Sequence, residues 1–145
     1  MLLFDGSMRT VLLLSILALS RGVHAAPCVA VAAPTTEDAA AVRAAVLAAI
    51  PAAPRACLDV SVAPIERVDS AAEITLAATV RVMISDERGR MTLLVSGGAT
   101  VHVRRAQFRD RKLAGYRRDA LDEAVGGIVP AVLTHLAPSA AQPRS

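Results

Sequence analysis

Residues 73–103 read EITLAATVRVMISDERGRMTLLVSGGATVHV, and this stretch decides the fold. Apolar and polar residues alternate along both of its halves, which is the period of a half-buried β-strand. The segment Asp86-Glu87-Arg88-Gly89 lies between the halves and is typical of a turn. The stretch therefore predicts a long antiparallel hairpin with one apolar face.

The expected register places the centre of the turn between residues 87 and 88. It sets Ile84 opposite Met91 and Ala78 opposite Gly97, so that apolar residues meet apolar residues on one face. The small residues at mid-sheet predict a position where a helix packs closely. The two consecutive glycines there are also compatible with a bulge or a local bend.

The segments before the hairpin predict further elements. Residues 29–32 favour a short strand, and residues 36–50 favour a helix that begins after a threonine cap and ends at Pro51. Residues 57–62 alternate again, and a right-handed crossover would set them parallel to the first strand. Residues 65–72 are interpreted as an exposed connection.

The chain becomes helical again from about Tyr116, and Pro130 predicts a kink or a division into two short helices. The predicted fold class is α+β. It comprises a three- to four-stranded, mainly antiparallel sheet built on the central hairpin 73–103, with two helices packed on one face. The element order is similar to small periplasmic α+β domains of the curli-assembly and penicillin-binding-protein-activator type. This likeness depends on Val29-Ala30-Val31 before a helix and on the late turn at 86–89.

The N-terminus has the pattern of a secretory signal. Arg9 precedes an apolar run, residues 11–19, and a small-residue cleavage pattern ends at Ala25. The run is too short to span a bilayer as a permanent helix. We therefore expect an exported protein, periplasmic or extracellular, that consists of a cleaved signal peptide (1–25), a single α+β domain (26–137) and a disordered tail (138–145).

Cys28 and Cys57 are the two cysteines of the chain. In an exported protein such a pair favours a disulfide. The chain-entropy model gives a loop of about 30 residues roughly 3 to 4 kcal/mol of stabilisation. The alternatives are two buried free thiols, or a lipid anchor on Cys28, which Pro27 disfavours.

A basic segment follows the hairpin and holds seven cations against one acid. One hypothesis is a contact surface for an anionic partner, an envelope protein or an anionic glycan. The other is a solvated connector whose cations pair with Glu66, Asp69 and Asp110. Nucleic acid is not expected, because few aromatic residues interleave with the charges. The cations are Arg104, Arg105, Arg109, Arg111, Lys112, Arg117 and Arg118.

The sequence contains no recognisable catalytic, metal-binding or phosphate-binding motif. No catalytic residue, metal or cofactor is therefore expected. His102 and His135 are the histidines outside the signal. The leading hypothesis is a non-catalytic binding or assembly accessory of the bacterial-type cell envelope, and the alternative is a small secreted hydrolase-like enzyme. Met83 and Leu94, on the uncovered face of the sheet, would also allow a homo-oligomer.

Overall fold

The structure is a computed structural model, and it describes residues 28–51 and 55–137. The predicted signal peptide and the predicted C-terminal tail lie outside the described residues. Within the described ranges, no helix combines the length and the apolar character that a membrane span needs.

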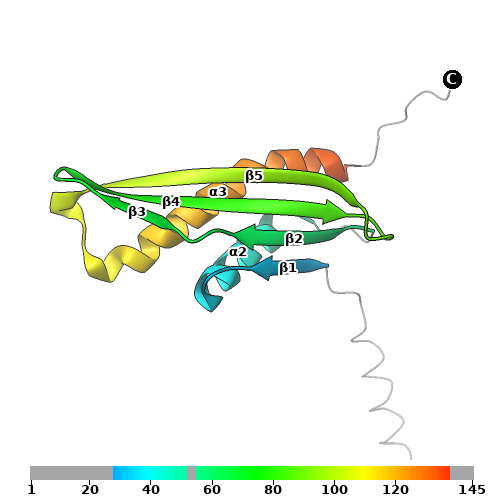
Figure 1. Cartoon of the computed structure of the whole chain (residues 1–145), viewed down its shortest axis with the longest axis horizontal. Coiled ribbons are helices and arrows are strands. Elements are labelled where there is room, and N and C mark those ends of the chain that lie inside the picture. The colour runs from blue at the N-terminus through cyan, green and yellow to red at the C-terminus, as the bar shows by residue number, and fades with distance from the viewer. Residues whose placement is uncertain (1–27, 52–54, 138–145) are drawn as a thin grey trace, which may run out of the picture.

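Within the described residues the sheet has five strands: β1 (Val29–Ala32), β2 (Cys57–Val62), β3 (Glu66–Asp69), β4 (Glu73–Ser85) and β5 (Met91–Arg104). The central strand is β4, which pairs along one side with β5 and along the other with β2 and β3 (Figure 1). All three pairings are antiparallel. The strand β1 adds to β2 in parallel, as predicted, so the sheet is mixed.

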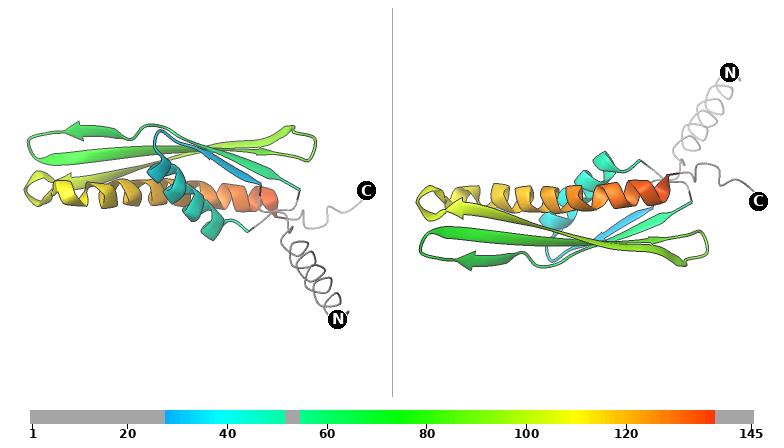
Figure 2. Two further views of the ribbon diagram at one scale, coloured as in Figure 1. Left: turned by 90° about the horizontal axis from the view of Figure 1, so that it is seen from below. Right: turned by 90° about the horizontal axis from the view of Figure 1, so that it is seen from above.

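Two helices, α2 (Thr36–Ala49) and α3 (Leu113–Leu136), cover one face of this sheet, and the other face is left uncovered (Figure 2). Thr35 caps α2 by accepting a hydrogen bond from the Asp38 amide. The core lies between the two layers and consists of aliphatic side chains. Its largest fully buried members are Leu76, Ile84, Leu121, Ile128, Val42, Val46, Val80, Val82, Val125 and Val132. The predicted α+β fold class is confirmed.

The strands β1 and β2 begin side by side, and this explains the disulfide. Val29 pairs with Leu58, which sets Cys28 beside Cys57, and the two Cα atoms lie 4.6 Å apart. The structure contains the predicted bond between them. The crossover through α2 therefore returns the chain to the point where β1 started.

The predicted register of the hairpin was wrong by two residues, for two separate reasons. The turn is one residue longer than assumed, with Ser85 paired to Met91 and Gly89 in the left-handed region at φ 74°. A bulge at Thr92 then adds a second residue, so that Ile84 pairs with Leu93. A shift of two leaves every later residue on its predicted face, since side chains alternate with period 2. Met91 alone changes to the uncovered face.

Two further expectations were wrong. The predicted exposed connection contains β3, which pairs with the first half of β4. The last helix is not divided at Pro130, because α3 runs unbroken from Leu113 to Leu136. The carbonyl that Pro130 leaves without a helical partner belongs to Gly126, which is exposed to solvent, so water can satisfy it. A 3₁₀ turn at Arg105–Gln107 and another at Asp110–Lys112 connect β5 to α3.

Candidate anion-contact site

The seven predicted cations lie at the end of the molecule opposite the 86–90 turn, where β5 leaves the sheet and α3 begins (Figure 1). We call residues 104–118 the basic segment. Its first cation ends β5, four belong to the 3₁₀ turns or lie between them, and Arg117 and Arg118 lie on α3. Sequence analysis treated these residues as one group, but the structure gives them different roles.

An aromatic contact fixes the path of the basic segment. The rings of Phe108 and Tyr116 pack with their centroids 5.5 Å apart, which joins the 3₁₀ turns to the first turn of α3. The Arg67 guanidinium, on β3, lies 5.0 Å from the centroid of the Phe108 ring. This is within the range of a cation–π interaction, so the segment is attached to the sheet as well as to the helix.

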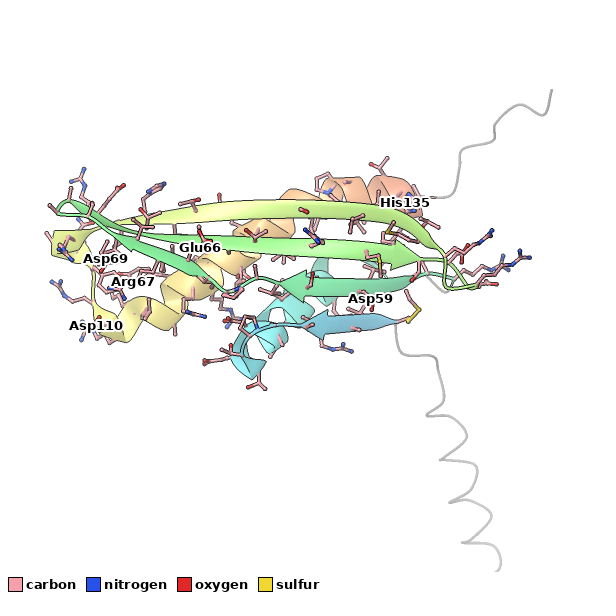
Figure 3. All side chains as sticks on the ribbon, in the orientation of Figure 1. Asp59, Glu66, Arg67, Asp69, Asp110 and His135 are labelled. Carbon is pink, nitrogen blue, oxygen red and sulfur yellow. A yellow bond between two sulfur atoms is a disulfide. The ribbon has the colours of Figure 1, made fainter. Side chains whose placement is uncertain are left out.

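Arg67 also organises the charges at this end. It donates two hydrogen bonds to the Asp69 carboxylate, at 2.8 and 3.1 Å, and Arg105 approaches the same carboxylate at 3.8 Å. Figure 3 shows Arg67, Asp69 and Asp110 together at this end. The hydrogen bond from Arg67, with the nearby charges of Arg67 and Arg105, holds the pKa of Asp69 below its ordinary value. The Asp69 carboxylate therefore stays charged and keeps both arginines oriented.

Arg117 forms the second internal ion pair of the basic segment. Its Nη2 donates to Asp38 Oδ2 at 2.9 Å, and the Asp38 side chain is only 8% exposed. Asp38 lies in the first turn of α2, where the helix dipole favours an acid. The pair thus joins the two helices near their N-terminal ends.

Asp38→Asn should lower the free energy of unfolding by about 1 to 2 kcal/mol. The substitution leaves Arg117 without its carboxylate, and the cost is limited because about a third of Arg117 already faces water. Urea denaturation measures the change. Glu37→Gln is the matched control, since Glu37 is exposed in the same helical turn, and it should cost about 0.5 kcal/mol or less. Equal losses in the two variants would contradict a structural role for the pair.

The other five cations have no internal ion pair in the part of the chain that the structure describes. No carboxylate there lies within 4 Å of Arg104, Arg109, Arg111, Lys112 or Arg118. Arg109 donates hydrogen bonds to the carbonyls of Ala106 and Phe108. Of the acids expected to neutralise the segment, only Asp69 pairs with one of its cations. Most of the positive charge is therefore available to a partner.

A groove lies beside the basic segment, between the N-terminal halves of α2 and α3. Its volume is about 600 Å³, and its walls are mainly alanine and glycine from both helices, with Leu121 among the lining residues. Arg118 lines it without an acidic partner among the described side chains, whereas Arg117 is already paired with Asp38. The groove thus offers a small apolar surface next to one unpaired cation.

Neither histidine is placed as a catalytic base beside a nucleophile. His102 uses a single atom, Nδ1, for both of its contacts, with Thr75 Oγ1 at 3.3 Å and with Glu73 at 3.4 Å. A base that activates a nucleophile needs one ring nitrogen for the nucleophile and the other for the orienting acid. The Thr92 hydroxyl, 3.0 Å from His135, donates to the Ile84 carbonyl, so its proton is not directed at the histidine.

Sequence analysis missed three of the residues that shape this end. Arg67 was part of an expected connection, and Phe108 and Tyr116 were noted only as aromatic residues among charges. A signal was available in the run Glu66-Arg67-Val68-Asp69, because alternating opposite charges are typical of an exposed edge strand. Within residues 28–51 and 55–137, no group of three or more acidic, histidine or cysteine side chains is placed to hold a metal ion.

The architecture defines a class of small α+β domains in which a mixed sheet carries two helices on one face. Neither a protein-family model nor a curated protein matches the sequence. Two solved structures share the fold. A Caulobacter crescentus CB15 protein assigned as a lipoprotein has a TM-score of 0.55 and 17% identity, over 78% of this chain and 93% of that chain. A minor lipoprotein from Acinetobacter baumannii has a TM-score of 0.51 and 13% identity, over 73% and 91% of the two chains. At these identities the likeness concerns the fold.

Proposed function

We propose that the protein is a non-catalytic binding or assembly accessory of the bacterial-type cell envelope, and that its basic segment contacts an anionic partner. The observation that carries this proposal is the set of five cations without internal ion pairs at an end fixed by Phe108, Arg67 and Asp69. A fixed array of charges loses little side-chain and backbone entropy when it binds. A flexible connector would lose more.

The envelope location is supported by three independent features. The N-terminal sequence has the pattern of an export signal, and the domain contains a disulfide of the kind that persists in oxidising compartments. Two structures of the same fold are described as bacterial lipoproteins. An exported domain in this setting meets anionic glycans and acidic surfaces of envelope proteins, and both are partners for arginine.

The test replaces three unpaired cations, Arg104→Ser, Arg111→Ser and Lys112→Ser, in one variant. Binding is measured as retention on an immobilised sulfated polysaccharide, at increasing salt, because exposed charge interactions are screened. At about 1 kcal/mol per cation, the variant should bind about a hundredfold more weakly at low salt, with a flatter salt dependence. The remaining cations keep the 3₁₀ turns in place.

The matched control removes three cations elsewhere, Arg55→Ser, Arg81→Ser and Arg88→Ser, and so has the same net charge. All three are exposed and lie outside the basic segment. Binding by this variant should fall severalfold at most. Equal losses in the two variants would reduce the effect to net charge and contradict a dedicated surface. Turnover of an ester or amide substrate that is lost on replacing His102 or His135 would instead favour the hydrolase alternative.

A further inference from the structure

The free edge of β5 is the feature that the proposed function leaves unexplained. No described strand pairs with the side of β5 that faces away from β4, and β5 borders the sheet over its whole length (Figure 1). Between Met91 and Val103 the sequence contains no Asp, Glu, Lys, Arg or Pro. A long, uncharged edge with unpaired backbone groups is a template for pairing with another strand.

The other two edges of the sheet are protected by the usual devices, and β5 is not. The edge strand β1 has four residues and a disulfide at its start. The edge strand β3 also has four residues, and three of them are charged. Short length and charge are the means by which soluble proteins prevent edge-to-edge pairing. The lack of both at β5 indicates that this edge is covered when the protein is at work.

The direction of the backbone groups limits how a second strand can pair. The Arg105 amide donates to the Ala72 carbonyl, and bonded pairs alternate along an antiparallel ladder. The odd-numbered residues of β5 therefore bond to β4, and the even-numbered residues direct their N–H and C=O groups outward. An added antiparallel copy of β5 must pair even residues with even residues.

The regular part of β5 fixes the centre of such a pairing. The bulge at Thr92 ends regularity on one side, and the 3₁₀ turn at Arg105 ends it on the other. The midpoint of Leu93–Val103 is Gly98, which is even-numbered. A two-fold axis there sets Val95 opposite Val101 and Leu93 opposite Val103, so each half-buried apolar residue meets an apolar residue of the second copy. No two like charges face each other.

We propose that β5 pairs with β5 of a second copy of this chain, antiparallel, across a two-fold axis at Gly98. The two sheets then form one continuous sheet with four helices on one face. Such an interface is self-complementary, which is the property that a two-fold dimer requires. The basic segments of the two copies lie at opposite ends of the joined strands, since the paired strands run in opposite directions.

Cysteine crosslinking tests the register directly. Gly98→Cys should form an intermolecular disulfide under mild oxidation, because residues directly opposite in a hydrogen-bonded antiparallel pair have Cα atoms about 5.5 Å apart. Thr100→Cys is the matched control on the same strand and face. Its counterpart in the second copy would be displaced by four residues, about 13 Å along the strand, and should not crosslink. Mass spectrometry verifies that Cys28 and Cys57 remain bonded in both variants.

A charge pair provides a second test that keeps the native cysteines. In the proposed register Ser96 faces Thr100 of the second copy, twice per dimer. S96E/T100K should retain the dimer, and S96E/T100E should weaken it about tenfold, from two cross-strand repulsions. Both variants place the same glutamate beside Arg81 of the same chain. Sedimentation equilibrium measures the dissociation constants.

The wild-type protein should sediment as a dimer. A monomer at every concentration, or crosslinking of Thr100→Cys as readily as Gly98→Cys, would overturn the proposal. Binding to the sulfated polysaccharide depends on the basic segment and not on β5, so a monomer that still binds would leave the proposed function intact.

Discussion

Replacement of both cysteines, by Cys28→Ser and Cys57→Ser, should lower the free energy of unfolding by about 3 to 4 kcal/mol. The two residues are separated by 29 positions, and the bond removes much of the freedom of that loop in the unfolded chain. The same bond holds β1, which pairs only with β2 in the described structure and has alternating half-buried and exposed residues. Urea denaturation of the mature protein measures the loss.

The reductant provides the control for this prediction. Wild-type protein with dithiothreitol should unfold at the same urea concentration as the double variant without it, and the reductant should leave the variant unchanged. Hydrogen exchange should report faster opening of residues 29–32 when the bond is absent, because few other contacts hold that strand. A double variant as stable as the wild type would show that the rest of the sheet holds β1 in place without the bond.

The faces of the central hairpin could be predicted from the sequence, but its register could not. Alternation fixes which residues face the helices, and all of them after the bulge were assigned to the correct face. Register depends on where the turn closes, and that depends on one side chain. Asp86 Oδ1 accepts hydrogen bonds from the amides of Arg88 and Arg90, both at 2.9 Å, which lengthens the turn by one residue. The alternation of apolar residues carries no signal for such a contact.

The candidate site was predictable as a set of charges and not as an arrangement. The cations of the basic segment are consecutive enough to stand out in composition. Their sorting into paired and unpaired groups depends on contacts between distant residues. Arg117 reaches Asp38 across 79 positions, and the ring of Phe108 is held by Arg67 of a strand that was not predicted. Periodicity describes one element at a time, so it cannot show which elements meet.

The predicted close approach between sheet and helix is found at Gly97, although its partner on β4 is Val80 rather than Ala78. Gly97 lies on the inner face of β5 beneath α3. A Cβ atom built on it would lie 2.6 Å from Ile128 Cγ2 and 2.9 Å from the Ala124 carbonyl oxygen. The second atom belongs to the helix backbone, so it cannot move unless α3 moves. The lack of a side chain at this position sets the distance between the two layers.

Gly97→Ala should therefore lower the free energy of unfolding by about 2 to 3 kcal/mol, the cost of forcing extra volume into a packed core. Gly98→Ala is the matched control, since its added Cβ lies on the uncovered face, with the nearest atom, the Ala78 carbonyl oxygen, at 3.4 Å. That variant should be unchanged or more stable by up to about 1 kcal/mol, because glycine is unfavourable within a strand. Urea denaturation of both variants measures the difference. Equal stability of the two would mean that α3 can shift away from β5 at little cost, and that Gly97 does not set the spacing between sheet and helix.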